Sequence, residues 1–243
     1  PPRPARGLRG TIVTPKRVCK SFLHEPALLD SHSPSATVCA SAYDWTMSDP
    51  ITTVTSIFDE HLAVAQTSRD SLAGPVVELA ATLIASYEPG GRLLVFGNGG
   101  SAGDAQHLAG ELTGHYRRDR RPLSALALTT DTSVLTATAN DYAYDDIFAR
   151  QVEAHCRPGD VVVGISTSGN AENVVRGVLA ARGRGATTWA LTGATGGRLR
   201  DAAEHAVQVP SDDTARIQEM HITVIHAVSE LVDRWVAEDQ TSR

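Results

Sequence analysis

Two histidines, a glutamate and a glutamine are spaced so that they could surround one metal ion. His107 and Glu111 are four residues apart and therefore share one face of a helix. Gln218 and His226 are eight residues apart in an apolar C-terminal segment, roughly 80° apart around a helix axis, so they could converge on one pocket. Imidazole and carboxylate are ligands that suit zinc. Histidines satisfied in the core or at an interface would give the same spacing, so both interpretations stay open.

A glycine-rich turn, Gly97–Ala102, stands directly before the helix that carries His107. Glycines let a backbone approach a ligand closely, and a helix start offers free N–H groups to an anion. The turn also fits the dinucleotide-binding pattern GxGxxA, which keeps an NAD-dependent enzyme open as an alternative. The acidic partner of that pattern is missing, because Asp131 lies 34 residues beyond Gly97. A Walker-type loop is excluded, because the chain contains no Gly-Lys pair.

A second anion-binding turn follows the apolar run Val161–Ile165. It contains the hydroxyl residues Ser166, Thr167 and Ser168, then Gly169 and Asn170, and a helix follows. A plain helix N-cap needs one hydroxyl, whereas three hydroxyls and a glycine can hold a phosphate monoester. Two such turns at the ends of two strands favour one ligand held at both. We therefore expect a sugar phosphate rather than a dinucleotide.

The elements that must position these residues follow from the apolar pattern. Short continuous apolar runs separated by helical segments are typical of parallel strands buried on both faces. The expected strands are Leu93–Phe96, Ala125–Leu128, Val161–Ile165, Thr187–Leu191 and Ala206–Val209. The expected leading helices run from Ser48-Asp49-Pro50 to Val64 and over Leu72–Tyr87, and a long C-terminal helix covers Thr214–Glu238. The sequence thus predicts an α/β protein of three layers, with about five parallel strands, helices on both faces, two leading helices and a long C-terminal helix.

The composition excludes several classes of protein. The 243 residues are 42% hydrophobic and 21% charged and carry a formal net charge of −6, which allows a sizeable core. The mild acidity argues against nucleic-acid binding, which needs a basic face. No apolar run approaches the roughly 20 residues that span a bilayer, so we expect no membrane partner. Cys19, Cys39 and Cys156 show no CxxC spacing, and we expect reduced thiols in a cytoplasmic protein.

The first 46 residues differ from the rest of the chain. They carry six basic and three acidic side chains, a net charge of +3, which leaves −9 for the remainder. They show no sustained helical or strand period and contain the Ser/Pro stretch Asp30–Ser35, so we expect a poorly ordered or dispensable extension over residues 1–46. The arginine content leaves a transit peptide open. Residues 47–243 are expected to form one domain.

Four motifs in order give the chain a family resemblance over about Ile51–Trp235. The chain resembles the SIS (sugar isomerase) family and, within it, the phosphoheptose isomerases, which interconvert sedoheptulose 7-phosphate and D-glycero-D-manno-heptose 7-phosphate. The motifs are GNGGSAGDAQHLAGELTG at 97–114, ALTTDTSVLTATANDYAYDDIFARQVE at 127–153, GDVVVGISTSGN at 159–170 and PSDDTARIQEMHITVIHAVSELV at 210–232.

The resemblance implies a role for each matching position. The substrate would contact Asn98, Gly99, Gly100, Ser101, Glu111, Asn140, Asp141, Ser166, Thr167, Ser168 and Gln218. One zinc ion per subunit would be held by His107, Glu111, Gln218 and His226, and Glu111 and His226 would be the catalytic pair. Ala171 departs from the family pattern, which usually has serine there, so one hydroxyl to the phosphate is missing. The family also implies a homotetramer whose sites lie at subunit interfaces.

Glu111 and His226 separate the main expectation from its alternative. Non-catalytic SIS adaptors of the DnaA initiator-associating type are tetramers that bind a replication initiator, and they resemble this chain through the same phosphate loops. They lack the glutamate and the second histidine that stand here as Glu111 and His226. The sequence therefore favours an aldose–ketose isomerase, which moves a proton between C1 and C2 through an enediol.

Overall fold

The computed structural model describes residues 49–241 of the chain. The predicted extension over residues 1–46, with Cys19 and Cys39, lies outside the described residues. Cys156 is a buried free thiol. Among the described helices, none combines the length and the hydropathy needed to cross a membrane.

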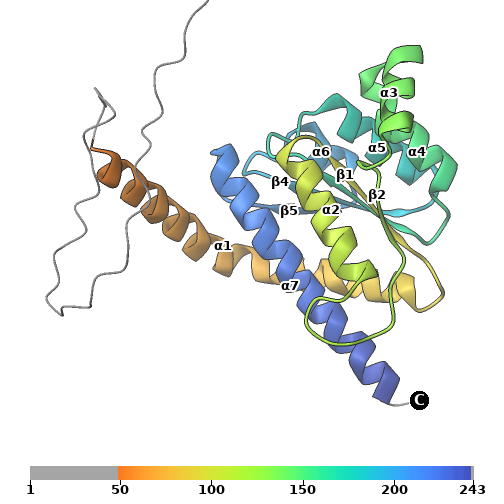
Figure 1. Ribbon diagram of the computed structural model, residues 1–243, viewed down its shortest axis with the longest axis horizontal. Helices are drawn as coiled ribbons and strands as arrows, with labels where there is room; N and C mark the ends of the chain where they lie inside the picture. The colour runs from red at the N-terminus through yellow and green to blue at the C-terminus, as the bar shows by residue number, and fades with distance from the viewer. Residues whose placement is uncertain (1–48, 242–243) are drawn as a thin grey trace, which may run out of the picture. The chain divides into compact units, whose positions relative to one another are not determined.

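A five-stranded parallel sheet forms the centre of the fold, in the order β2-β1-β3-β4-β5 (Figure 1). The five expected strands are confirmed to within two residues at each end. Their bounds are β1 Leu93–Gly97, β2 Ala125–Ala127, β3 Val161–Ile165, β4 Thr187–Thr192 and β5 His205–Gln208. β1 pairs in parallel with both β2 and β3, so the strand order changes direction between β1 and β3. In such a sheet, ligands bind beside the carboxyl ends of the strands at that point.

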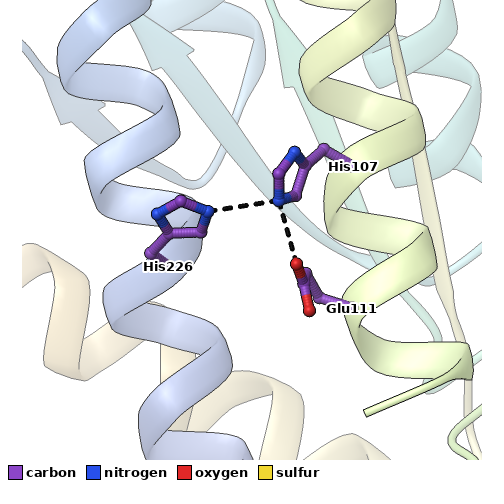
Figure 2. A group of neighbouring side chains, drawn as sticks. All are labelled: His107, Glu111 and His226. Carbon is purple, nitrogen blue, oxygen red and sulfur yellow. Dashed lines mark hydrogen bonds and ion pairs between the residues drawn. The ribbon is translucent and has the colours of Figure 1, made fainter. Parts of the chain in front are cut away.

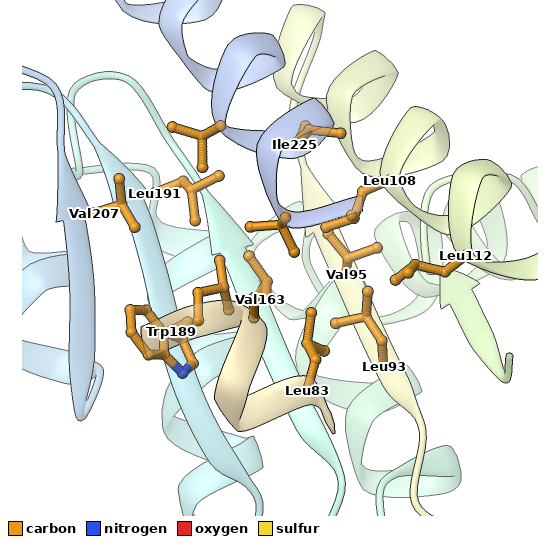
Figure 3. Close-up of a cluster of buried hydrophobic side chains, with 14 of the residues drawn as sticks. Leu83, Leu93, Val95, Leu108, Leu112, Val163, Trp189, Leu191, Val207 and Ile225 are labelled. Atoms are coloured by element: carbon orange, nitrogen blue, oxygen red, sulfur yellow. The ribbon is translucent and has the colours of Figure 1, made fainter. Parts of the chain in front are cut away.

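Helices cover both faces of the sheet, which confirms the predicted three-layer α/β fold. α1 (Pro50–Tyr87), α2 (Gly100–Thr113) and α7 (Thr214–Thr241) share one hydrophobic core with one side of the strands. α4 (Ile147–His155), α5 (Glu172–Gly183) and α6 (Gly197–Ala202) share a second core on the opposite side, with α3 (Thr132–Asp141) and the short 3-10 helix Tyr144–Asp146 at its edge. Alternate residues of β1 show the division. Leu93 and Val95 face the first core (Figure 3), whereas Leu94 and Phe96 face the second.

The prediction of two leading helices is wrong, because α1 is one continuous helix of 38 residues. The expected start is confirmed: the Asp49 side chain accepts a hydrogen bond from the Thr52 N–H at 3.2 Å, and Pro50 occupies the first turn. Pro75 lies inside the helix and lacks an N–H, yet it does not end it. The apolar pattern changes near Ser68 because the helix changes what it packs against. Its buried residues begin there, and the first half is largely exposed.

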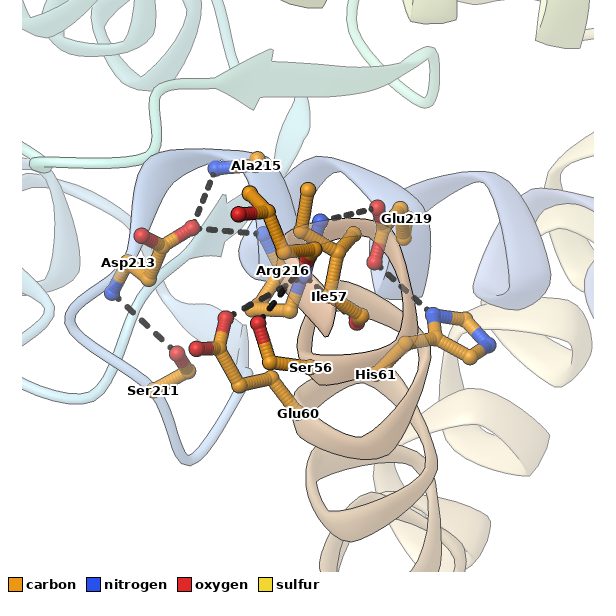
Figure 4. Close-up of polar contacts among 10 residues, drawn as sticks. Ser56, Ile57, Glu60, His61, Ser211, Asp213, Ala215, Arg216 and Glu219 are labelled. Atoms are coloured by element: carbon orange, nitrogen blue, oxygen red, sulfur yellow. Dashed lines mark hydrogen bonds and ion pairs between the residues drawn. The ribbon is translucent and has the colours of Figure 1, made fainter. Parts of the chain in front are cut away.

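The exposed half of α1 is tied to the start of α7 by a polar cluster (Figure 4). The buried Arg216 donates to the Ile57 carbonyl oxygen at 2.8 Å and to the Glu219 carboxylate at 2.7 Å. His61 contacts the other carboxylate oxygen of Glu219 at 2.8 Å. α7 is therefore held against α1 at its first turn, and it continues along α2, where the candidate ligands lie.

Candidate functional site

The β1–α2 turn and the β3–α5 turn meet at the point where the strand order reverses. A Cβ on Gly97 would come within 2.8 Å of the Ile165 carbonyl oxygen, so only glycine allows this approach of the two strand ends. Asn98 and Asn173 exchange amide hydrogen bonds of 2.8 and 2.9 Å across the gap. Asn173, in the first turn of α5, was not singled out from the sequence. Both predicted anion-binding turns therefore belong to one crevice.

The predicted phosphate loop lines a cavity of about 230 Å³, here called the hydroxyl-lined cavity. Thr167 and Ser168 contribute from the β3–α5 turn. Three hydroxyl residues that sequence reasoning missed, Thr195, Ser211 and Thr214, lie in the same wall, as does one carboxylate, that of Asp212. Ser166 is buried beneath the loop. Ala171 is the N-cap of α5 and provides no side-chain hydrogen bond there, which fits the hydroxyl missing at this position.

α2 and α7 bring His107, Glu111 and His226 together, and we call these three residues the triad (Figure 2). His107 Nε2 lies 2.9 Å from Glu111 Oε1 and 3.1 Å from His226 Nε2. All three ligand atoms lie within 4.8 Å of one another. α2 supplies two of them from consecutive turns of one face, as their spacing predicts. α7 supplies the third because it packs beside α2.

The geometry of the triad suits a tetrahedral zinc ion. Ligand atoms at roughly 2.0–2.1 Å from zinc in a tetrahedron are separated by about 3.3 Å. The two contacts within the triad, 2.9 and 3.1 Å, are close to that separation. Two imidazoles and one carboxylate leave a fourth position for a further ligand or a substrate, as in catalytic zinc sites. The chemistry and spacing of the donor atoms therefore fit the expected metal.

Three further predicted residues, Gln218, Asn140 and Asp141, do not join the triad in this structure. The Gln218 side chain packs over Gly100 at the first turn of α2, and it precedes His226 by eight residues, about 12 Å along a helix. Asn140 and Asp141 are exposed at the end of α3, where the Asn140 amide donates to Asp141 at 2.8 Å. Asp141 lines a different cavity of about 440 Å³. Their assignment to ligand or substrate stays a prediction.

Asp104 adds a carboxyl group that sequence reasoning did not select. It lies one turn before His107 on α2, and its Oδ2 is buried with no hydrogen-bond partner among the described residues. Burial raises the pKa of Asp104 to about 6, against the opposing charge of His107. The spacing of three residues to His107 was the available signal, because residues three apart share a helix face.

His221 lies between Gln218 and His226 on α7 and is completely buried. Its Nε2 faces the Thr192 carbonyl oxygen at 3.3 Å, and its Nδ1 has no partner among the described residues. Burial lowers the pKa of His221 to about 4, although the hydrogen bond to Thr192 acts in the opposite direction. The imidazole is therefore neutral at pH 7, and it serves the packing of α7 on β4.

We expect His221 to make the free energy of unfolding fall as the pH is lowered from 6.5 to about 4. In this window the unfolded chain binds a proton that the folded chain excludes, which favours unfolding by about 2–3 kcal/mol at the acid end. Urea unfolding of the wild type and of His221→Gln at a series of pH values measures this. The stability of the wild type should fall more steeply, and equal slopes would contradict the assignment.

The geometry divides the site into two ends with different chemistry. The hydroxyl-lined cavity offers donors to an anion, and the described residues contain no lysine that could help to bind it. The triad offers a carboxylate that can accept a proton and an imidazole that can donate one. An elongated, monophosphorylated substrate can use both ends at once.

Comparisons with known proteins agree with this division. A family model described as the SIS domain matches residues 58–193. The phosphoheptose isomerase of Aquifex aeolicus is 51% identical to this chain over 185 residues, which cover 76% of the chain and 97% of that relative.

Two solved structures are also similar to the chain. The phosphoheptose isomerase of Neisseria gonorrhoeae has 44% sequence identity and a TM-score of 0.72, with 76% of this chain and 98% of that one covered. The phosphoheptose isomerase of Francisella tularensis has 33% identity and a TM-score of 0.75, with 76% and 99% covered. The residues matched by the family model include the β1–α2 and β3–α5 turns, His107 and Glu111, whereas His226 lies beyond them on α7.

Proposed function

The chain belongs to the SIS-domain family and, within it, to the phosphoheptose isomerases, and we propose that it converts sedoheptulose 7-phosphate to D-glycero-D-manno-heptose 7-phosphate. The observation that carries the proposal is the triad, which holds a base and an acid within hydrogen-bond distance of a shared centre. The substrate carries its phosphate at C7 and reacts at C1 and C2. A site with an anion-binding end and a separate acid–base end matches that arrangement.

The proposed mechanism moves one proton between neighbouring carbons. Glu111 removes the proton from the carbon next to the carbonyl and returns it to the other carbon, so that an enediol forms and collapses. His226 donates a proton to the ring oxygen when the ring opens or to the C2 carbonyl oxygen as the enediol forms, and it takes up the proton of the C1 hydroxyl as the aldehyde forms. The hydroxyls of Ser166, Thr167 and Ser168 hold the phosphate, so that C1 and C2 stay beside Glu111. The backbone of Gly99 and Gly100 and the side chains of Asn98 and Ser101 complete the substrate contacts.

His107, Glu111 and His226 would hold a zinc ion in this enzyme, and Gln218 is the fourth ligand that the family implies. When bound, zinc supplies a positive charge that polarises the substrate oxygens and stabilises negative charge on them. One carboxylate oxygen of Glu111 would hold the metal, and the second oxygen would accept the proton. His107 on α2 and His226 on α7 would then hold the two helices together at the metal.

We propose a homotetramer with sites at subunit interfaces, as the family implies, in the cytoplasm. Two features of one face support an oligomer. The first half of α1 exposes large apolar side chains, among them Ile51 at 75%, Phe58 at 64% and Leu62 at 63% of their surface. Beside it lies a predominantly apolar cavity of about 410 Å³ between α1 and α7. Burial of this face against other subunits would remove apolar surface from water.

The adaptor alternative is not favoured. An adaptor that binds a replication initiator needs no acid–base pair, yet this chain brings Glu111 and His226 to the same centre as His107. The similar proteins reported above are isomerases by name. The NAD-dependent alternative also loses support. A dinucleotide would need a second nucleotide-binding region in the crevice, and the described residues place the hydroxyl-lined cavity and the triad there.

Zinc analysis joined to an isomerase assay tests the proposal. We expect about one zinc per subunit, turnover of sedoheptulose 7-phosphate, loss of activity in a chelator and recovery when zinc is added back. His107→Ala should no longer bind zinc, and its kcat should fall at least 10²-fold, because the metal and the acid–base chemistry that it supports would be lost. His115→Ala is the matched control, since His115 continues the same sequence stripe but is exposed outside α2. A wild type that is active without zinc would contradict the metal assignment. A zinc-loaded wild type that does not convert sedoheptulose 7-phosphate would contradict the substrate assignment.

A further inference from the structure

A completely buried ion pair links the two helices of the triad. Arg120 Nε lies 2.6 Å from Asp233 Oδ1, and both side chains have no exposed surface. Arg120 belongs to the loop 114–121 that follows α2, and Asp233 follows His226 on α7 by seven residues, close to two helical turns. Asp233 and His226 therefore share one face of α7. Neither charged residue has a role in the proposed chemistry.

Arg120 fixes the end of α2 that carries Glu111. Its Nη2 donates to the Glu111 carbonyl oxygen at 2.7 Å, and its Nη1 donates to the Leu112 carbonyl oxygen at 2.8 Å. The same Nη1 also reaches the Gly114 carbonyl oxygen at 3.2 Å. The last carbonyls of a helix have no partner within the helix. The guanidinium satisfies that of Glu111, and it adds a second donor to that of Leu112, which also accepts the Leu123 N–H at 3.1 Å. The backbone of Glu111 is thereby anchored to α7 through Asp233.

Asp233 fixes the loop that covers His226. Its Oδ2 accepts the N–H groups of Arg117 at 2.7 Å and Arg118 at 3.0 Å, and its Oδ1 accepts the Tyr116 N–H at 3.5 Å. Burial raises the pKa of Asp233, but these N–H donors and Arg120 outweigh it, so its pKa is lowered and the carboxylate stays charged. A single carboxylate thus sets the path of three consecutive loop residues.

The loop places an aromatic ring against the triad. The Tyr116 ring is stacked on the His226 ring, with centroids 5.4 Å apart and an angle of 26° between the planes. The Arg117 guanidinium lies over the Tyr116 ring at 4.9 Å from its centroid. His226 also meets the His107 ring at 5.0 Å and 60°. The imidazole of His226 is therefore confined on two sides, and its Nε2 is directed at His107.

We propose that Asp233, Arg120 and Tyr116 are positioning residues, which hold the His226 ring and the Glu111 backbone in the arrangement that binds the metal. This inference rests on the proposed function. Partners that orient metal ligands typically contribute 10–100-fold to metal affinity or activity. Tyr116 would fix the orientation of the His226 ring by stacking on it. The ion pair would fix the loop that carries Tyr116 and the end of α2 that carries Glu111. None of the three side chains needs to touch substrate.

The Tyr116 variants give the decisive test, because Tyr116 is only half-buried and its removal leaves the ion pair intact. In Tyr116→Ala we expect zinc affinity, measured by competition with a chelator, to fall 10–100-fold. At saturating zinc, kcat should fall by about tenfold or more while KM changes less than about twofold, since the phosphate end is untouched. Tyr116→Phe retains the ring and should restore both values. Wild-type zinc affinity and kcat in Tyr116→Ala would overturn the proposal.

The ion pair is tested by a double variant that removes both charges. Arg120→Met with Asp233→Leu leaves no unpaired buried charge, and such replacements often keep a protein stable. We expect this variant to remain folded and to bind zinc at least tenfold more weakly. A folded double variant with wild-type zinc affinity would overturn the role of the ion pair. If it does not fold, the comparison of Asp233→Asn with the wild type at saturating zinc decides, with the same expected loss in kcat.

The control is a second ion pair between the same loop and α7. Arg118 contacts Glu230 at 3.0 Å, but both side chains are partly exposed, and the hydrogen bonds of Glu230 among the described residues go to Arg118 and Arg234. Glu230→Gln should leave zinc affinity and kcat unchanged, and a loss equal to that of Asp233→Asn would overturn the proposal. A wild type that binds no zinc would instead count against the proposed function, which keeps the two failures apart.

Discussion

Replacing Glu111 with glutamine is expected to lower kcat for the isomerisation of sedoheptulose 7-phosphate by about 10³-fold or more. Glutamine keeps the size of the side chain and one oxygen, but it cannot accept a proton from carbon. The loss corresponds to at least about 4 kcal/mol in the activation free energy. KM should change little, because the substitution leaves the proposed phosphate site, the hydroxyl-lined cavity, unchanged. A steady-state assay at saturating zinc measures both values.

A second measurement separates the loss of the base from the loss of the metal. If Glu111 is the base, the wild type should incorporate deuterium into substrate carbon in heavy water, because a protonated carboxyl group exchanges with solvent before the proton is returned. Glu111→Gln should not, even when metal analysis finds it loaded with zinc. Glu153→Gln is the matched control, since Glu153 is exposed on α4, away from the triad. If Glu111→Gln retained kcat within tenfold of the wild type, Glu111 would not be the base.

The elements that position the site follow from local patterns in the sequence. β1, β3 and β4 are short apolar runs that end at glycine or hydroxyl residues, and the parallel arrangement brings the turns after β1 and β3 to one edge. His107 and Glu111 are placed by helical spacing alone, because both belong to α2. These features depend on neighbours along the chain. They could therefore be predicted before any contact between distant segments was known.

Contacts between distant segments could not be predicted in the same way. The sequence shows that Gln218 and His226 lie on one helix, but only the packing of α7 along α2 decides that His226 meets His107 while Gln218 meets Gly100. The amide pair of Asn98 and Asn173 joins residues 75 positions apart. Periodicity indicates which residues face inward and does not indicate the residue they meet.

The sequence did not predict that α1 is continuous, nor that Arg120 and Asp233 form a buried ion pair, and the reasons are related. The interruption of the apolar pattern between Val64 and Leu72 predicts two helices, although it marks the place where one continuous helix reaches the core. Arg120 belongs to a run of arginines that a sequence alone assigns to solvent, and its partner Asp233 is 113 residues away. A buried charge is recognised only by its partner. Both features depend on contacts between segments that are far apart in the sequence.

Replacing Gly169 with alanine is expected to have the largest effect at the phosphate end of the site. Gly169 has a φ of +65°, which costs an L-residue about 1–2 kcal/mol. A Cβ there would also collide with the Gly196 carbonyl group and lie 2.9 Å from the Gly197 nitrogen. The β3–α5 and β4–α6 turns would have to separate, at a further cost of about 1–3 kcal/mol. We expect the free energy of unfolding to fall by about 3–4 kcal/mol in urea titrations.

The same separation should weaken substrate binding, because both turns line the hydroxyl-lined cavity. They are joined by the hydrogen bond from the Leu199 N–H to the Gly169 carbonyl oxygen, 2.8 Å, which the collision would break. KM should rise at least tenfold, and kcat should fall much less, because the phosphate contacts act on substrate and transition state alike. Gly159→Ala is the matched control: its φ is +87°, yet a Cβ there meets nothing within 4 Å. Its free energy of unfolding should fall only by the cost of the positive φ, about 1–2 kcal/mol, and its KM should not change. Equal losses in stability and KM for the two variants would mean that the close approach of the turns does not shape the phosphate site.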